Sequence, residues 1–487
     1  MIGIVSYGAY LPRLRLERKA MVAANGWMDS TLRAHGKGER TMANWDEDSI
    51  TMAVEAARDC LAGQERNSIQ ALYFASTSLP FADRQNAGIV AAALGLSEPL
   101  ATLDITASQK AGTSGLLAGL SAAKAAGGPV LFAAADRRRT KSASAQEMHF
   151  GDGAAALMLG SEEVVAEFLG GYSTSVDFVD HYRGENHSFD YVWEDRWIRD
   201  EGFGKIIPPV IARALEKAGV KATEIDHFVL PCIYGGVAVG IAKKVGLRPQ
   251  AVRDNLAAVC GETGTAHAIV MLVDALQDAK PGQLLLVCGF GQGSDALVFR
   301  ATDRLTALPK RAGVKGSLKR RKEETNYLKF LTFNHLVTQE RGLRAEYNPQ
   351  TALSALYRKR EMVLGLVGGI CHTCKTPQFP MEEVCVNPEC KAVGLQQPYS
   401  FADRMARTAS WSADALVYSI DPPTHYGMIH FDGGGCFMAD FTDCDVGGVD
   451  VGTQMRMMFR ILGVDEMRGM TRYFWKATPI SAFGKEN

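Results

Sequence analysis

Four of the ten cysteines stand close together in the C-terminal third of this 487-residue chain. Their spacing is Cys371-x-x-Cys374, ten residues, and then Cys385-x4-Cys390. Cysteine pairs on two turns bring four thiolates to the corners of a tetrahedron, which is the coordination that Zn²⁺ prefers in closed structural sites. We therefore predict a structural Zn²⁺ site without an open position. The alternative is a group of four unliganded core thiols.

The composition excludes several classes of protein. There are 53 Lys+Arg and 54 Asp+Glu residues, so nothing in the net charge of −1 calls for nucleic acid or an anionic membrane surface as a partner. The basic cluster Lys310–Lys322 is interpreted as a solvated connection. No apolar run approaches the roughly 20 residues of a membrane span, and the N-terminus lacks the pattern of a signal peptide. We expect a soluble, cytoplasmic protein with reduced cysteines.

Short apolar runs alternate with amphipathic stretches over about the first 300 residues, which favours a mixed α/β core with both sheet faces covered. Residues 1–165 and 205–303 each end in a Gly-rich strand pattern, so the sequence indicates a rough internal repeat. The predicted strands are Ala71–Ala75, Val130–Ala135, His227–Leu230 and Gln283–Cys288, and the predicted helices are Thr51–Ala62, Lys110–Ala126 and Ala266–Leu276. The polar and aromatic segment Gly170–Glu201 is either a cap over a pocket or a surface excursion.

The composition changes after Asp303. Lys310–Glu324 is predicted as a linker, and Asn326–Arg344 and Gln350–Leu364 as helices. Beyond the cysteine cluster, short strands separated by Pro and Gly turns predict a small barrel. These strands are Ala415–Ile420, Gly427–Phe431, Cys436–Phe441 and Gln454–Ile461.

The chain up to about Arg344 resembles the 3-hydroxy-3-methylglutaryl-CoA synthases, particularly the archaeal type, and more distantly ketoacyl synthase III. The motifs that carry the resemblance are Gly3–Pro12, Lys110–Thr113, Phe150–Ala155, Ile241–Gly246 and Gly293–Asp295. The resemblance implies an α/β thiolase fold of five layers, with duplicated halves over residues 1–165 and 166–345. It also implies a homodimer and a coenzyme A thioester as substrate.

The C-terminal part resembles the proteins with a zinc ribbon and an OB-fold that act as partners of such synthases and thiolases. The matching pieces are the two cysteine pairs, Phe379-Pro380 and Val451–Arg456. This resemblance implies a helical hairpin and zinc ribbon over residues 346–395 and an OB-fold over 396–487. In that family the OB-fold helps to bind or channel CoA thioesters. A separate thiolase subunit is a further predicted partner.

The catalytic positions depart from the family pattern. Synthases of this type use a Cys nucleophile, a His and an Asn that stabilise an oxyanion, and a Glu acid/base. Aligned motif by motif, the nucleophile position holds Gln109 and the acid/base position holds Thr77. The His position falls on Pro231, followed by Cys232, and the Asn position falls on Glu262. Because Gln109 cannot form an acyl-enzyme, a ping-pong mechanism through acyl-Cys is not expected.

Three hypotheses follow for the function. The first is an enzyme that makes or breaks a C–C bond by retro-aldol or retro-Claisen chemistry without an acyl-Cys intermediate. Retro-aldol cleavage needs only a base and an enolate stabiliser. Glu262 is the candidate base, because burial among apolar neighbours raises the pKa of a carboxyl group. Gln109 is a candidate donor to an oxyanion, and Tyr234, Cys232 and His267 are candidates within reach, although each is also explained as core filling. The other hypotheses are a thioester decarboxylase and a non-catalytic acyl-CoA-binding or scaffold subunit.

Overall fold

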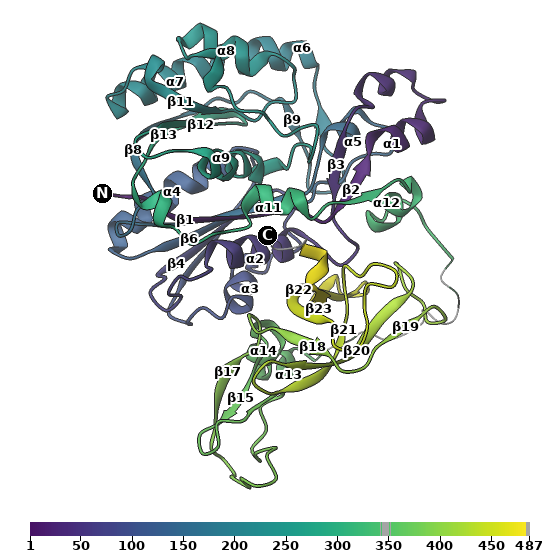
Figure 1. Cartoon of the computed structure of the whole chain (residues 1–487). Coiled ribbons are helices and arrows are strands. Elements are labelled where there is room, and N and C mark those ends of the chain that lie inside the picture. The colour runs from purple at the N-terminus through teal and green to yellow at the C-terminus, as the bar shows by residue number, and fades with distance from the viewer. Residues whose placement is uncertain (341, 343–349, 351, 484–487) are drawn as a thin grey trace. The chain divides into compact units, whose positions relative to one another are not determined.

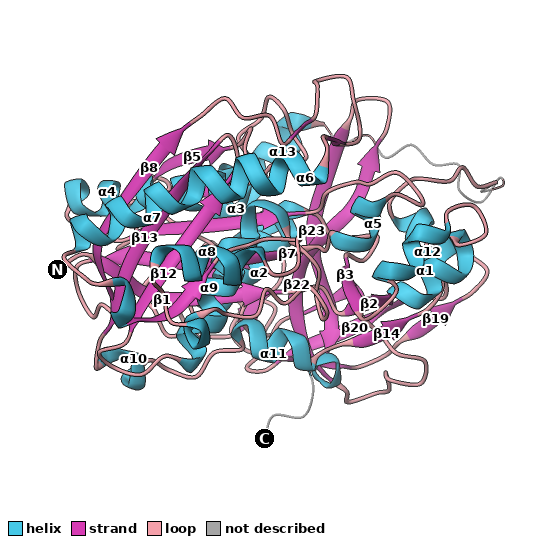
Figure 2. Cartoon of the chain, turned by 90° about the horizontal axis from the view of Figure 1, so that it is seen from above, coloured by secondary structure: helices cyan, strands magenta, loops and turns pink. Residues whose placement is uncertain are grey.

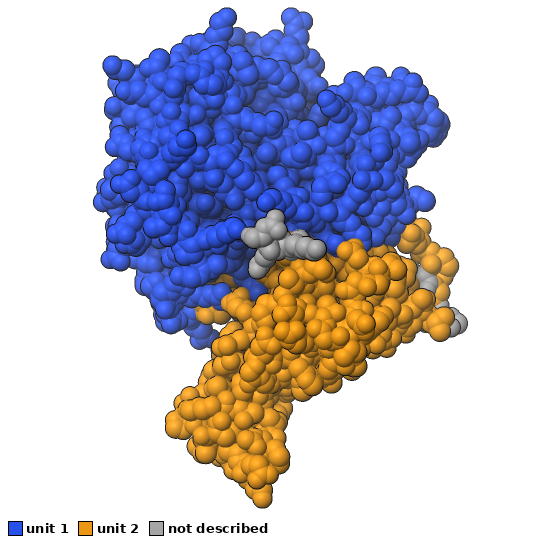
Figure 3. Space-filling view, viewed as in Figure 1, with its two compact units in different colours: residues 1–44, 48–88, 97–336 blue, residues 45–47, 89–96, 337–487 orange. Residues whose placement is uncertain are grey.

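The computed structural model describes residues 1–340, 342, 350 and 352–483. Its contacts divide the chain into two compact units, which Figure 3 colours separately. The first unit comprises Met1–Asn44, Asp48–Gly88 and Ser97–Leu336, and the second comprises Trp45–Glu47, Ile89–Leu96 and Val337–Asn487. Among the described residues, no helix is both long and apolar enough to cross a membrane.

The first unit contains a nine-stranded sheet, and five of its strands form an N-terminal half. The order in this half is β5-β4-β6-β7-β1. Strand β4 is parallel to β5 and β6, whereas β7 is antiparallel to β6 and β1. The bounds are β1 Gly3–Tyr10, β4 Ala71–Ala75, β5 Ala101–Ile105, β6 Val130–Asp136 and β7 Gly153–Gly160.

The C-terminal half of the sheet repeats this arrangement. Strand β8 is antiparallel to β13, β13 is antiparallel to β12, and β12 is parallel to β11. A parallel bridge between Phe228 and Val252 stands where the first half has its fifth strand. Strands β1 and β8 pair and so join the halves. The bounds are β8 Ala166–Ser175, β11 Ile225–Val229, β12 Leu284–Phe290 and β13 Gly293–Ala301.

Helices form the other layers of the first unit, as Figures 1 and 2 show. Helix α2 (Ser49–Cys60) packs on β1, β6 and β7, and α7 (Gly204–Ala218) packs on β8, β12 and β13. Helices α4 (Ala111–Ala126) and α9 (His267–Asp278) contact each other and strands of both halves. They therefore form a middle layer between the two halves. The glycines of α4 permit this close packing, since a Cβ on Gly115 would lie 2.6 Å from the Phe132 ring.

A smaller sheet of the first unit corrects one prediction. Lys310–Glu324 is not a linker, because it forms α11 (Gly313–Lys319) and β14 (Lys322–Glu324), which pairs in parallel with β2 (Leu14–Glu17). Strand β2 also pairs with β3. The remaining elements numbered before α12 are α1 Arg18–Asn25, β3 Glu39–Met42, α3 Asn86–Ala93, α5 Ala145–His149, β9 His181–Tyr182, β10 Tyr191–Val192, α6 Asp195–Trp197, α8 Val237–Val245 and α10 Arg304–Ala307.

The two helices predicted after the linker are shorter than expected. Within Asn326–Arg344 the structure has α12 (Tyr327–Phe333), which ends before His335, a residue with a φ of 55°. Residues 341, 343 and 344 of that range lie outside the described residues, as do residue 351 and the predicted domain boundary at 345/346. The described part of the second predicted helix contains α13 (Leu353–Arg358) and α14 (Arg360–Gly365).

The second unit contains two sheets. In the first, β15 pairs with both β16 and β17. In the second, β20 pairs with β18, β19 and β21, and β22 pairs with β18 and β23. A parallel bridge between Phe441 and Ala477 connects the end of β21 to β23 and closes the circuit of strands. The bounds are β15 Val367–Cys371, β16 Pro377–Gln378, β17 Gln396–Ser400, β18 Ala406–Thr408, β19 Ser412–Asp414, β20 Thr424–Phe431, β21 Cys436–Asp440, β22 Gln454–Asp465 and β23 Met470–Pro479.

One of the predicted strands of this unit is wrong. Ala415–Ile420 is not a strand, because the Asp414 carboxylate accepts hydrogen bonds from the backbone N–H groups of Leu416 and Val417 and so turns the chain. The other three predicted strands lie within or overlap β20, β21 and β22. Strands β18, β19 and β23 were not predicted.

Buried charges also hold the second unit together. Arg460, which is fully buried, lies 3.0 Å from a carboxylate oxygen of Glu47 and of Asp443. Asp46 accepts a hydrogen bond of 2.9 Å from Lys476 Nζ. Burial alone would raise the pKa of Asp46, but Lys476 and Arg460 outweigh it and hold that pKa below its ordinary value. This cluster therefore stabilises the second unit above the titration of Asp46 and loses that contribution as the pH falls through it.

Candidate active site

The predicted site residues of the first unit gather at the carboxyl ends of strands. Thr77 follows β4, Gln109 follows β5, and Cys232 and Tyr234 follow β11. The backbone of Glu262 forms a bridge with Phe150. Ligands of open α/β sheets bind outside the carboxyl ends of the parallel strands. The duplicated sheet thus presents candidate residues from both halves at the edge where chemistry is expected.

Gln109 stands two residues before α4, at the meeting point of the two halves. The hydroxyl of its neighbour Ser108 donates a hydrogen bond of 2.9 Å to the carbonyl of Gly291, at the end of β12. A Cβ on Gly291 would lie only 3.1 Å from the backbone nitrogen of Gln109. The side-chain Oε1 of Gln109 is buried and has no hydrogen-bond partner within the described residues. An unpaired buried amide oxygen is costly and is a feature of functional sites.

Glu262 is held by its backbone and by an ion pair. Its N–H donates a hydrogen bond of 2.8 Å to the carbonyl of His149, and its own carbonyl accepts one of 2.9 Å from Gly151. Its carboxylate forms a salt bridge with Arg138. We predicted an apolar environment for this carboxylate, and the structure instead places a guanidinium beside it. The side chain of Glu262 is therefore anchored to the guanidinium of Arg138.

Thr77 is fixed by the buried carboxylate of Asp136, the last residue of β6. The Thr77 hydroxyl donates a hydrogen bond of 2.9 Å to Asp136, and the Thr77 N–H donates one of 2.8 Å. Asp136 also accepts hydrogen bonds from the hydroxyls of Ser76 and Ser78 and from the N–H of Thr265. One carboxylate thus connects the loop after β4 to the loop that carries Glu262.

His267 has no ring nitrogen free in this arrangement. Its Nε2 lies 2.9 Å from the carbonyl of Asn255, to which it must donate. Its Nδ1 accepts from the N–H of Thr263 at 3.2 Å and lies 3.1 Å from the Thr263 hydroxyl. Burial lowers the pKa of His267, so the neutral tautomer is favoured. This geometry agrees with the packed core histidine that we named as the alternative to a catalytic role.

Cys232 and Tyr234 are turned toward protein groups. The Cys232 Sγ is buried and lies 3.7 Å from the carbonyl of Tyr234, and burial raises its pKa to about 12. The Tyr234 hydroxyl donates a hydrogen bond of 3.1 Å to Asp195. Burial and the carboxylate of Asp195 raise the pKa of Tyr234. Neither side chain is a thiolate or phenolate near neutral pH, so neither is poised for nucleophilic attack.

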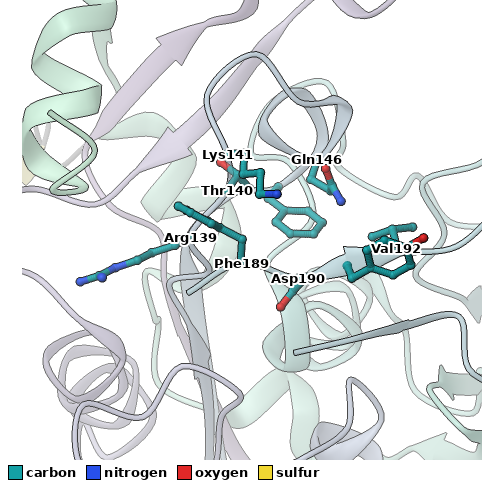
Figure 4. Close-up of a pocket in the computed structure, with 9 residues that line it drawn as sticks. Arg139, Thr140, Lys141, Gln146, Phe189, Asp190 and Val192 are labelled. Atoms are coloured by element: carbon teal, nitrogen blue, oxygen red, sulfur yellow. The ribbon is translucent and has the colours of Figure 1, made fainter. Parts of the chain in front are cut away.

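A small cavity is lined by two residues that contact Arg138. Its volume is about 190 Å³, and Phe150 and Asp190, which both contact Arg138, are part of its wall. Figure 4 shows its lining side chains, of which Arg139 extends away from the other labelled ones. The lining residues are Arg139, Thr140, Lys141, Gln146, Phe150, Phe189, Asp190, Tyr191 and Val192.

The segment Gly170–Glu201 contributes one wall of this cavity. Its first residues complete β8, and residues 189–192 line the cavity. Arg183 of this segment forms a salt bridge of 2.7 Å with Asp190 and donates a hydrogen bond to the carbonyl of Thr77. Of the two interpretations that we gave for the segment, a cap over a pocket accounts for these contacts.

Three charged residues of the site, Arg138, Asp136 and Asp190, were not predicted from the sequence. A signal was present for the first two, because Asp136 and the run Arg137–Arg139 directly follow the predicted strand Val130–Ala135. Charged residues at the carboxyl end of a buried strand are positioned for a site at that edge of the sheet. Nothing in the sequence marked Asp190, which is one of many charges in a polar segment.

The four cysteines of the second unit lie together. Their Sγ atoms are all within 4.8 Å of one another, with 3.8 Å between Cys371 and Cys390 and 3.5 Å between Cys374 and Cys385. Tetrahedral Zn²⁺ with Zn–S bonds of about 2.3 Å separates its sulfur ligands by about 3.8 Å. The donor set and its spacing therefore fit Zn²⁺.

Comparisons with known proteins agree with this architecture. Residues 215–300 match the C-terminal domain of 3-oxoacyl-[acyl-carrier-protein] synthase III. A hydroxymethylglutaryl-CoA synthase of Aeropyrum pernix is 30% identical over 66% of this chain and 91% of its own length. The same enzyme of Caldivirga maquilingensis is 27% identical over 70% of this chain and 99% of its own length. A crystal structure of HMG-CoA synthase complexed with CoA superposes with a TM-score of 0.60 at 16% identity, covering 72% of this chain and 94% of that one.

The duplicated halves, the middle helices and these matches together confirm the thiolase fold of the first unit. The chain belongs to the hydroxymethylglutaryl-CoA synthase family. Within that family it carries Gln109, Thr77 and Glu262 at the positions where our alignment places a Cys, a Glu and an Asn.

The state of Cys232 can be tested by alkylation. Because burial raises the pKa of Cys232 to about 12, we expect iodoacetamide at pH 8 to leave it unmodified in the native protein while the exposed Cys436 reacts. Peptide mass spectrometry after a time course measures both sites in one sample. Labelling of Cys232 ahead of Cys436 would show a reactive thiol and contradict this description.

Proposed function

We propose that the protein is an acyl-CoA enzyme that makes or breaks a C–C bond by retro-aldol-type chemistry without an acyl-Cys intermediate. The observation that carries the proposal is the carboxylate of Glu262 paired with Arg138, in a family fold whose nucleophile position holds Gln109. Phe150 and Asp190, which contact Arg138, line a cavity. The CoA thioester substrate is supported by similar structures, since HMG-CoA synthase is known in complex with CoA and MvaS in complex with 3-hydroxy-3-methylglutaryl coenzyme A.

In the cleavage direction, Glu262 removes the proton from the hydroxyl on C3 of a 3-hydroxyacyl-CoA. The C2–C3 bond breaks, C3 leaves as an aldehyde or ketone, and the electron pair forms an enolate of the thioester. The side-chain amide of Gln109 is proposed to stabilise the enolate oxygen by donating a hydrogen bond to it. The backbone of Gln109 lies close to Gly291. Protonated Glu262 then returns the proton to C2, so atoms and charge balance without a co-reactant.

Neither Gln109 nor Cys232 offers a nucleophile for a covalent route. Gln109 is an amide, and Cys232 is a buried thiol whose pKa is about 12. A decarboxylase remains an alternative, although ketosynthase-like decarboxylases normally keep the His pair that this chain lacks. A non-catalytic acyl-CoA-binding or scaffold subunit is the second candidate, and the replacement of the family's four catalytic residues favours it.

We further propose that the second unit is a zinc ribbon followed by an OB-fold that helps to bind the CoA thioester. The short distances between the four sulfur atoms support Cys371, Cys374, Cys385 and Cys390 as ligands of the Zn²⁺ ion. A closed five-stranded barrel is supported by the pairing order of the strands, which is β18–β20–β21–β23–β22. The contact between the end of β21 and β23 is parallel, and β19 extends β18 along β20. In such a design the metal maintains the fold and takes no part in the reaction.

A homodimer and a separate thiolase subunit are the proposed protein partners. Strand β5 ends the large sheet, pairs only with β4 among the described residues and exposes Leu103. An unpaired sheet edge is a template for pairing with another chain. A second copy that pairs along β5 would cover this edge.

The enzyme hypothesis is tested with a panel of 3-hydroxyacyl-CoA and 3-oxoacyl-CoA esters, followed by mass spectrometry of the CoA products. We expect wild-type protein to yield shortened acyl-CoA and Glu262→Gln to lose at least about 100-fold in rate, because the base is removed. Glu216→Gln, an exposed carboxylate of the same unit, is the matched control and should keep wild-type activity. Binding without turnover, or turnover only after a thiolase is added, would favour the scaffold subunit instead.

Metal analysis tests the zinc site independently of activity. We expect about one Zn²⁺ per chain. Cys385→Ser should lose the metal, and the turns that carry the cysteines should unfold, because structural zinc contributes folding free energy. Cys436→Ser, a cysteine outside the cluster, is the control and should retain the metal. A preparation with an intact second unit and no bound metal would contradict the proposal.

A further inference from the structure

Arg138 is a buried charged residue for which the family pattern gives no role. It is 5% exposed and lies two residues after β6. A buried guanidinium is destabilising unless its charge is compensated. Its partners are Glu262, in a direct salt bridge, and Asp190 at 3.8 Å. Phe150 lies beneath it, with the ring centre 3.5 Å from the guanidinium carbon.

Arg138 belongs to a series of neighbouring side chains in which positive and negative charges alternate. Asp190 is paired at 2.7 Å with Arg183, which also donates a hydrogen bond to the carbonyl of Thr77. The order is therefore Thr77–Arg183–Asp190–Arg138–Glu262. This series connects the loop after β4 in one half of the sheet to the Glu262 loop in the other half. Asp190 is thus shared between Arg183 and Arg138, whereas Glu262 pairs with Arg138.

These partners do not accept from every hydrogen-bond donor of Arg138. Its Nε is buried and has no hydrogen-bond partner within the described residues. Both Phe150 and Asp190, which contact the guanidinium, also line the 190 Å³ cavity. The ion pair is therefore connected to the cavity through Phe150 and Asp190.

We propose that Arg138 is the positioning residue of the reaction, which holds and orients the Glu262 carboxylate next to residues that line the cavity. This assignment rests on the proposed function, because it gives Arg138 a role through the proposed base. The cavity is then the place where the hydroxyl-bearing carbon of the acyl chain meets Glu262. The polar lining by Thr140, Lys141, Gln146 and Asp190 suits an acyl chain that carries polar groups near C3.

The test compares steady-state kinetics of wild type, Arg138→Met, Arg138→Lys, Glu262→Gln and the double variant Arg138→Met/Glu262→Gln. We expect Arg138→Met to lower kcat about 100-fold with KM within about threefold, since an action through the base affects the chemical step. Arg138→Lys keeps the charge, so its kcat should be at least about tenfold higher than that of Arg138→Met. The double variant should be no slower than Glu262→Gln, because the two residues act as one unit.

The double variant also answers the risk that Arg138→Met does not fold. That single variant leaves a partly buried carboxylate unpaired, whereas the double variant removes both charges. Arg213→Met, an exposed arginine that pairs with Glu216, is the control and should behave as wild type. The assignment would be overturned if the double variant were slower than Glu262→Gln by the full effect of Arg138→Met. It would also be overturned if Arg138→Met raised KM and left kcat unchanged.

The outcomes also separate this assignment from the proposed function. If wild-type protein turns over no ester of the panel, the proposed function fails and the role of Arg138 fails with it. If wild type and the Glu262→Gln loss are as expected but Arg138→Met and Arg138→Lys are equally impaired, the function stands and the charge of Arg138 is not the reason for its presence.

Discussion

The geometry of the site depends on the hydrogen bonds that one buried carboxylate accepts. Asp136 ends the central strand β6 and binds the side chains of Ser76, Thr77 and Ser78 together with the backbone of Thr265. These groups belong to loops that lie far apart in the sequence. Because the donors point at a single charge in the interior, neither loop can move without leaving buried polar groups unpaired. The positions of Thr77 and of the Glu262 loop follow from this constraint.

Much of the first unit could be predicted because it obeys local rules. Ala71–Ala75 coincides with β4, and the apolar runs before Asp136 and Gly291 are strands of a sheet covered on both faces, where sequence and burial agree. The charged stretch Lys310–Glu324 was misjudged because strand β14 lies at a sheet edge, where half of its side chains can face solvent. Ala415–Ile420 failed because a side chain, Asp414, competes with the sheet for the backbone donors.

The candidate site was predicted less completely than the fold. Motif alignment placed Gln109, Thr77 and Glu262 at catalytic positions of the family. In the structure, Thr77 and Gln109 follow the carboxyl ends of β4 and β5. The alignment could not show that Glu262 pairs with Arg138, since the two residues are 124 positions apart and the pairing is decided by tertiary packing. The same limit applies to His267, whose helical position fits catalysis and core packing equally until the partners of both ring nitrogens are known.

The central claim is that cleavage leaves an enolate of the CoA thioester, which Glu262 protonates at C2 without acylation of the protein. In the reverse direction the same base removes a proton from C2 of the acyl-CoA product. Deuterium exchange measures this directly: the shortened acyl-CoA released in the panel is incubated with the protein in D₂O, and both the ester and the intact protein are weighed by mass spectrometry. The account predicts deuterium at C2, an intact thioester and an unchanged protein mass, with exchange lost in Glu262→Gln. An acyl adduct on the protein, or no exchange in wild type, would contradict it.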